Sequence, residues 1–246
     1  MDIENFWDVG PHDAIPVEES MDSFIKGQSG VKISEIFNKT PVFNNADYWF
    51  EKEKIIIELK EIETEFLHSK SAQEQFLTLL ERLKNNELDM SSFHSEYIRI
   101  ARPPLGRILK KANKQIKETK EYFGMPEIKG CVVIVNDGFT SVAHNLVIGL
   151  LCSHLDGSYK SIDSLIYLTI NRYVEIQGSD EPKLIWTPIY RDEKDDYLVD
   201  FVNQLGKKWF DFLEEKLGPF TSRISTDEYD ILRNSHSILL PLEERY

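Results

Sequence analysis

Apolar residues recur along the chain with two spacings, and these predict both strands and helices. Short runs rich in β-branched and aromatic residues, bounded by turn residues, are typical of strands. Apolar residues three and four positions apart are typical of helices that pack one face on a core. We predict strands over residues 46–50, 55–63, 130–139, 164–176 and 183–192, and helices over residues 72–88, 105–123, 141–154 and 196–218.

The order of these elements favours a mixed sheet flanked by helices. It runs strand, strand, helix, strand, helix, strand, strand, helix, which places the chain in the α/β (or α+β) class. The strands over residues 164–176 and 183–192 are expected to be antiparallel neighbours across the turn between them. No linker rich in Gly, Ser or Pro divides the sequence, so residues 1–246 are treated as a single domain.

Four local features bear on where the expected elements begin and end. Residues 1–30 have weak periodicity and are expected to form an N-terminal arm or an adaptor for a partner. The segment 31–37 is ambiguous between a strand and a short helix. Pro103 and Pro104 are expected to end one element and open the next, because proline lacks a backbone N–H. Gly124 stands at the expected C-terminal end of the helix over residues 105–123.

Composition excludes several classes of protein. No apolar run approaches the roughly 18 to 20 residues that a membrane span needs. The acidic N-terminus lacks the basic start and apolar run of a signal peptide. Cys131 and Cys152 lie in apolar surroundings without CxxC spacing, which argues against a disulfide framework or a zinc site. We therefore expect a cytoplasmic protein without a membrane partner.

Basic residues gather in one segment of an acidic chain. The formal net charge of −13 argues against a protein that simply coats nucleic acid, because affinity for phosphates comes mainly from Lys and Arg. Residues 99–120 nevertheless hold eight basic residues and a single acid, Glu118. Such a strip is able to bind a polyanion. The alternative interpretation is a helix face that is merely solvated.

The candidate chemistry lies on the first two predicted strands. Glu58 and Lys60 project from the same face of one strand, because successive side chains alternate. Charged groups at the end of a triple-isoleucine run must be paired, or bound to something, to be tolerated. A hairpin through residues 51–54 would bring the carboxylate of Asp47 beside Glu58. A hard divalent cation is a natural way to hold two carboxylates together.

The spacing of Asp47, Glu58 and Lys60, D-x(10)-E-x-K on consecutive strands, resembles the PD-(D/E)XK phosphodiesterases, a superfamily that includes many restriction and repair nucleases. The resemblance implies a restriction-endonuclease-like fold in which Asp47 and Glu58 ligate Mg²⁺ (or Mn²⁺). It also implies that Lys60 orients or activates the attacking water. The resemblance spans residues 33–138, and Ala46 stands where the family has proline.

The resemblance also implies contributions from helices. Members often add a polar residue, frequently Gln, from a helix packed on the sheet after the lysine strand, and Gln115 lies at the edge of the apolar stripe of residues 105–123. Many members use an acidic residue from a preceding helix, for which Glu35 is the candidate. Gln115 is therefore expected to be a catalytic residue that contacts the scissile phosphate together with Lys111. The residues expected to contact nucleic acid are Arg107, Lys110, Lys111 and Lys114.

Together these residues predict a metal-dependent nuclease that hydrolyses the backbone of DNA or RNA, with DNA favoured by the frequency of DNA-cleaving members. Cleavage of both strands needs two sites, which a homodimer supplies. Two alternatives stay open. The same fold could act as a non-catalytic module that binds a protein partner, for example in a defence or toxin system, with the charged trio only pairing. The ELK sequence could also be accidental in an unrelated α/β protein.

Overall fold

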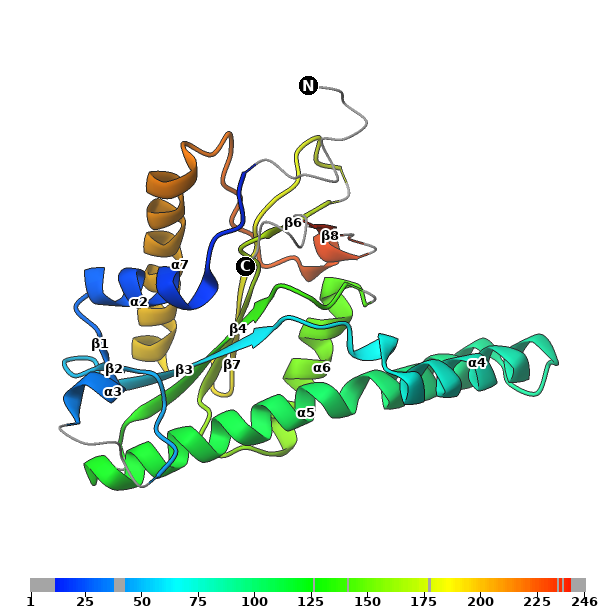
Figure 1. Ribbon diagram of the computed structural model, residues 1–246, viewed down its shortest axis with the longest axis horizontal. Coiled ribbons are helices and arrows are strands. Elements are labelled where there is room, and N and C mark those ends of the chain that lie inside the picture. Colours follow the sequence, from blue (N-terminus) through cyan, green and yellow to red (C-terminus); the bar gives the residue numbers. More distant parts are fainter. Residues whose placement is uncertain are drawn as a thin grey trace.

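Helices lie against both faces of a central sheet in the computed structural model of the chain (Figure 1). The structure describes residues 12–37, 43–125, 127–140, 142–176, 178–233, 235 and 237–239. Its first elements are α2 (Val17–Gly27), β1 (Val31–Lys32), α3 (Ile33–Ile36), β2 (Tyr48–Phe50), β3 (Ile55–Ile62), η1 (Phe66–His68), α4 (Lys70–Lys84) and α5 (Met90–Phe123). They are followed by β4 (Lys129–Asn136), α6 (His144–Gly157), β5 (Ser164–Leu168), β6 (Arg172–Val174), β7 (Trp186–Tyr190), α7 (Asp196–Leu217), η2 (Tyr229–Leu232) and β8 (Ser237–Leu239).

Six strands form the central sheet in the order β1-β2-β3-β4-β5-β7. The three central strands β3, β4 and β5 are parallel, whereas β2 is antiparallel to β3 and β7 is antiparallel to β5. This mixed sheet with flanking helices confirms the predicted α/β class. The antiparallel pairing of β5 with β7 confirms the expectation for the two strands after residue 163.

The strand predicted over residues 164–176 is two strands, β5 and β6. Between them the side chain of Asn171 accepts a hydrogen bond from the Ile15 N–H at 2.8 Å and donates one to the Ile15 carbonyl at 3.0 Å. The chain then leaves the central sheet, and β6 pairs with β8 in a separate two-stranded sheet. Apolar residues continue through the break, so the hydrophobic pattern does not reveal it.

One face of the sheet is covered by α5 and α6. Because β4 is buried on both faces, it reads as an almost continuous apolar run rather than an alternating one. Side chains of alternate strand positions meet the apolar stripe of α5. The fully buried residues on this side include Ile56, Val132, Ile134, Leu165 and Tyr167 from the strands and Leu105, Leu109, Ala112 and Ile116 from α5.

The opposite face is covered by α2 and α7 (Figure 1). The expectation of a loose arm over residues 1–30 is therefore wrong for residues 17–27, because α2 buries Met21, Phe24 and Ile25 in this second core. Phe24 makes an edge-to-face contact with Trp209 of α7, with ring centroids 5.0 Å apart. Residues 1–11 lie outside the described part of the chain.

The expected boundary at Pro103 and Pro104 is wrong, because α5 runs without interruption from Met90 to Phe123. A proline inside a helix leaves a carbonyl one turn earlier without its helical N–H donor, which is normally destabilising. Here Ala101 and Leu105 are both fully buried on either side of the prolines. Packing of this stripe on the sheet therefore offsets the local cost. The predicted end of the helix is confirmed, since Gly124 adopts the left-handed conformation at φ 65°.

The ambiguous segment 31–37 contains both predicted structures, a two-residue strand β1 and the single helical turn α3. Among the described residues, no helix combines the length and the apolar character that crossing a bilayer requires.

Candidate active site

The pairing of β2 with β3 brings the predicted trio together. Tyr48 is the partner of Ile57 in the antiparallel register, so Asp47, one residue earlier, lies opposite Glu58. The Asp47 N–H donates to the Ile57 carbonyl at 3.2 Å, which extends the pairing to this residue. The charge of Asp47 acts on the neighbouring carboxyl group of Glu58. Lys60 lies two residues beyond Glu58 on the same face of β3, and its Nζ donates to Oε1 of Glu58.

Asp47 also takes part in the backbone structure of the sheet. Its Oδ2 accepts a hydrogen bond from the N–H of Leu59 at 2.7 Å. The last β3 residue with a β2 partner is Ile57, so this N–H lies where regular strand pairing has ended. The carboxylate therefore replaces the carbonyl that a longer β2 would have supplied.

Burial sets the charge state of the two acids. The side chain of Glu58 has no exposed surface, and Lys60 keeps 16% of its side chain exposed. Burial, followed by the charge of Asp47, raises the pKa of Glu58 to about 8, although Lys60 opposes the shift. Burial also raises the pKa of Asp47, against the hydrogen bond from Leu59 and the charge of Lys60. The pair therefore favours binding a proton, or another positively charged species, near neutral pH.

One carboxylate oxygen of the trio has no hydrogen-bond partner among the described residues. Oε2 of Glu58 is buried, and no N–H or O–H donor among the described residues reaches it. No group of three or more His, Cys, Asp and Glu side chains in the described ranges could hold a metal ion by itself. Two carboxylates nevertheless fit Mg²⁺, which is commonly held by one or two protein carboxylates and completes its shell with water and phosphate oxygens.

Helix α5 is anchored beside the trio by three side chains. Gln115 donates from Nε2 to the carbonyl of Asn45 at 3.2 Å, and Thr119 accepts from the N–H of Ala46 at 2.8 Å. Glu118 accepts from the N–H of Asn44 at 2.9 Å. Gln115 therefore lies near the trio, as predicted, because it binds Asn45 in the segment that leads into Asp47. Oε1 of Gln115 is buried and has no donor among the described residues.

The predicted cationic residues of α5 differ in their pairing. Arg107, Lys110 and Lys111 are exposed and have no acidic partner in the described parts of the chain. Lys114 pairs with Glu118 at 3.5 Å. Farther along the helix, Lys120 pairs with Asp163 at 3.0 Å. The strip is thus neutralised towards the C-terminal end of α5 and keeps its charge over residues 107–111.

The helical acid predicted from the resemblance lies away from the trio. Glu35 is exposed on α3, and no contact joins it to Asp47, Glu58 or Lys60 in the structure. Outside the trio, the charge of Glu18 of α2 makes the smallest of the contributions to the raised pKa of Asp47. Sequence reasoning does not single out Glu18, because residues 1–30 have no clear helical period.

Glu18 also borders a cavity of about 470 Å³ between the start of α2 and the carboxyl ends of β3 and β4. Its acidic lining disfavours phosphate, so an anionic substrate is not expected to approach Asp47 from this side. The carboxylates that line it belong to Glu18, Glu19, Asp22, Glu61, Glu63 and Asp137.

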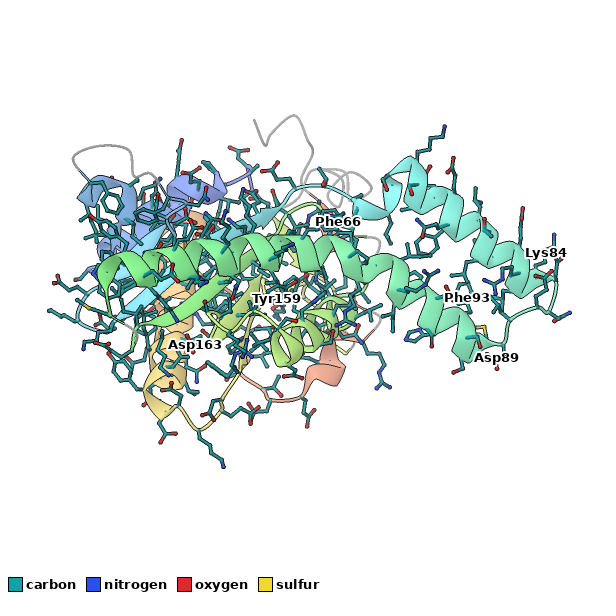
Figure 2. The ribbon with its side chains drawn as sticks, turned by 90° about the horizontal axis from the view of Figure 1, so that it is seen from below. Phe66, Lys84, Asp89, Phe93, Tyr159 and Asp163 are labelled. Carbon is teal, nitrogen blue, oxygen red and sulfur yellow. The ribbon has the colours of Figure 1, made fainter. Side chains whose placement is uncertain are left out.

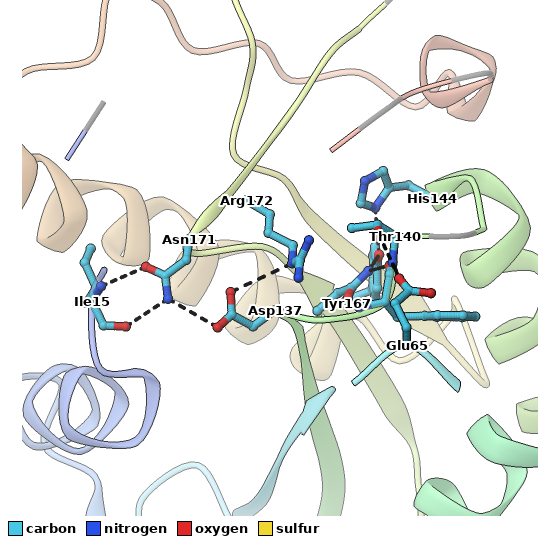
Figure 3. Close-up of polar contacts among 10 residues, drawn as sticks. Ile15, Glu65, Asp137, Thr140, His144, Tyr167, Asn171 and Arg172 are labelled. Atoms are coloured by element: carbon cyan, nitrogen blue, oxygen red, sulfur yellow. Dashed lines mark hydrogen bonds and ion pairs between the residues drawn. The ribbon is translucent and has the colours of Figure 1, made fainter. Parts of the chain in front are cut away.

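A polar network continues from the cavity along the ends of β4 and β5 (Figure 3). Asn171 lies 3.5 Å from Asp137, and Arg172 lies 4.0 Å from the other carboxylate oxygen of Asp137. Beyond Arg172, Nδ1 of His144 lies 2.7 Å from the hydroxyl of Tyr167. Burial, helped by the charge of Arg172, lowers the pKa of His144 to about 4. These groups fix the β4–α6 connection and do not reach the trio.

Comparison of the chain with protein-family models, with curated proteins and with solved structures finds no match.

Proposed function

We propose that the chain is a metal-dependent phosphodiesterase that hydrolyses the backbone of nucleic acid, with Asp47, Glu58 and Lys60 as its catalytic core. One observation carries the proposal. Two carboxyl groups and one ammonium group meet where β2 ends, and a buried oxygen of Glu58 has no hydrogen-bond donor among the described residues. This donor set fits the D-x(10)-E-x-K pattern of the PD-(D/E)XK superfamily.

Asp47 and Glu58 would hold Mg²⁺ or Mn²⁺, which supplies a Lewis acid for the phosphate and lowers the pKa of bound water. Lys60 keeps partial exposure and holds the attacking water in line with the scissile bond through its ammonium group. Gln115 supports this arrangement by fixing Asn45, two residues before Asp47. Gln115 is therefore a positioning residue rather than one that touches the reacting atoms.

The substrate approaches over α5 in this proposal. Arg107, Lys110 and Lys111 bind backbone phosphates, because they are exposed cations of the strip and have no acidic partner in the described chain. The acidic cavity beside Glu18 repels phosphate from the other direction. DNA is the proposed substrate class, with RNA as the alternative, because DNA-cleaving members are frequent in the superfamily that the pattern resembles. Backbone contacts of this kind do not depend on base sequence.

A second candidate function is a non-catalytic module that binds a protein partner. The observation that favours it is the complete burial of Glu58 together with its ion pair to Lys60. In this case the trio is a structural cluster, and divalent cations have no specific effect on the folded chain.

Calorimetric titration with Mn²⁺ separates the two candidates. The proposal expects wild type to bind one ion, and Asp47→Asn and Glu58→Gln to lose this binding while remaining folded. Glu63→Gln is the matched control, because it removes an acid from the cavity and not from the trio. Equal binding by Asp47→Asn and wild type, with loss only in Glu63→Gln, would place the cation in the cavity and contradict the proposal.

A further inference from the structure

Large hydrophobic side chains are exposed where α5 ends. This helix crosses the sheet on the outside of the molecule (Figures 1 and 2). Tyr122 in its last turn is 58% exposed, and Met125, just beyond the helix, is 40% exposed. Ile36 of α3 is 45% exposed and precedes Phe37, whose ring contacts Tyr122. Contiguous apolar surface of this kind often marks a binding site.

Two partly buried rings hold the exposed ring of Tyr122 in place. Phe43 stacks with Tyr122, with ring centroids 4.9 Å apart and an interplanar angle of 24°. Phe37 makes an edge-to-face contact with Tyr122 at 5.1 Å. More than half of the surface of Tyr122 still faces solvent. An aromatic ring that is fixed at the surface in this way can stack with a further planar group.

Tyr122 lies on the same face of α5 as Lys111 and Gln115. Each residue turns an α-helix by about 100°, so the eleven residues from Lys111 to Tyr122 complete three turns to within about 20°. Lys111 is exposed and lies about 17 Å from Tyr122 along the helix axis. Gln115 lies between them and binds Asn45, in the segment that leads into Asp47. The ring of Tyr122 is therefore on the path that the proposed substrate takes over α5.

The ring that stacks with Tyr122 is also tied to the trio. Phe43 precedes Asp47 by four residues, and the N–H of Asn44 between them donates to Glu118 of α5 at 2.9 Å. Glu118 is an acid on the same face of the helix as Tyr122. Its charge is balanced by this hydrogen bond and by an ion pair at 3.5 Å with the lysine one turn earlier. The stacked rings are therefore held at a fixed position relative to Asp47.

The charge of α5 indicates which ligand meets this ring. Residues 105–123 hold six basic and two acidic residues, a formal charge of +4, whereas the whole chain carries −13. A positive helix favours a polyanion over a second copy of this acidic chain. Cations that hold phosphates, combined with an aromatic ring that stacks with bases, are the features by which proteins bind single strands. In a duplex the bases stack on one another, so their faces are not available to the ring.

We propose that Tyr122 stacks with an unpaired base, so that the site takes single-stranded nucleic acid in preference to a duplex. The inference rests on the proposed function for the course of the strand over α5. Lys111 holds a phosphate on one side of the trio, and a base on the other side lies on the ring of Tyr122. Tyr122 therefore determines the structure of the nucleic acid that the site accepts.

Fluorescence anisotropy of the full chain with labelled oligonucleotides of about 12 nucleotides, in chelator to prevent cleavage, tests this inference. Wild type should bind oligothymidylate or oligouridylate at least about fivefold more tightly than a duplex of equal length, and the stronger of the two identifies DNA or RNA. Tyr122→Ala should weaken single-strand binding about five- to hundredfold, the effect of losing one stacked base, and leave duplex binding unchanged. Tyr122→Phe keeps the ring and should bind as wild type does. Tyr197→Ala is the matched control, because Tyr197 of α7 is 55% exposed.

Equal single-strand binding by Tyr122→Ala and Tyr197→Ala would overturn the inference, as would tighter binding of the duplex by wild type. An abasic strand should bind wild type and Tyr122→Ala equally, because it offers no base, and weaker binding of it by Tyr122→Ala would also overturn the inference. Circular dichroism verifies that each variant is folded, which is expected for exposed side chains. Strand binding through Tyr122 without cleavage would contradict only the proposed function, whereas cleavage without any effect of Tyr122→Ala on binding would contradict only this inference.

Discussion

The carboxylate of Asp47 accepts a 2.7 Å hydrogen bond from the N–H of Leu59, at the point where β2 no longer pairs with β3. In a longer antiparallel pair a backbone carbonyl would accept from this N–H. Asp47 therefore has a structural role at the strand end in addition to its place beside Glu58. The two roles can be separated by substitution.

Asp47→Ala is expected to lower the free energy of unfolding by about 1 to 3 kcal/mol, because it leaves the partly buried N–H of Leu59 without its acceptor. Asp47→Asn retains an acceptor oxygen and removes an acid whose pKa is raised by burial, so its stability should equal or exceed that of wild type. Urea unfolding at neutral pH measures both. Equal stability of Asp47→Ala and wild type would show that the hydrogen bond contributes nothing.

His144 predicts a pH dependence of stability. Its folded pKa of about 4 lies below the usual value of 6.5, so the unfolded chain binds a proton more readily between these values. The free energy of unfolding should therefore fall as pH decreases from 6.5 to 4, with His144 contributing up to about 3 kcal/mol of the loss.

The contribution of His144 is obtained from unfolding curves of wild type and His144→Asn at several pH values. The variant should show a smaller loss of stability between pH 6.5 and 4 than wild type. His68→Asn, which removes an exposed histidine, is the control and should keep the dependence of wild type. Parallel pH profiles for all three proteins would contradict the assignment.

The sequence was sufficient for the central strands and the trio, because local rules determine both. The alternation that places Glu58 and Lys60 on one face holds for any strand. The short turn over residues 51–54 returns the chain directly from β2 to an antiparallel β3. The register that sets Asp47 opposite Glu58 follows from this hairpin.

What the sequence did not predict depends on tertiary contacts. The continuity of α5 through Pro103 is determined by packing on the sheet, which overrides the local preference of proline. The charge of Glu18 acts on the pKa of Asp47 only because α2 packs on the same face of the sheet as α7. The break between β5 and β6 depends on hydrogen bonds between Asn171 and Ile15, 156 residues away.

The continuous α5 leads to a prediction about Pro103, which is exposed and leaves the carbonyl of Arg99 without a helical donor. Pro103→Ala restores this N–H and should raise the free energy of unfolding by about 1 to 2 kcal/mol. Ser95→Ala, at another exposed position of α5, should change it by no more than about 0.5 kcal/mol. A loss of stability in Pro103→Ala, measured by urea unfolding, would argue against a helix through residue 103.

The cationic strip predicts a salt dependence for nucleic-acid binding. Replacing Lys110 and Lys111 by alanine should weaken binding of an oligonucleotide and reduce the slope of log K against log salt by about 1.5, because each phosphate contact contributes about 0.7 to 0.9. Lys207 and Lys208 of α7 are an adjacent exposed pair, and their double alanine variant is the control. Fluorescence anisotropy at several salt concentrations measures the slopes, and equal slopes for the two double variants would place the nucleic acid elsewhere.

The most direct test of the proposed function is cleavage of plasmid and single-stranded DNA, and of RNA, by the full chain in the presence of Mg²⁺ or Mn²⁺. Lys60→Met should abolish cleavage without unfolding the protein, and Lys52→Met, which changes an exposed lysine in the β2–β3 turn, should cleave as wild type does. The account predicts metal-dependent products that disappear with chelator and with Lys60→Met. Absence of cleavage by wild type, or equal cleavage by wild type and Lys60→Met, would contradict it.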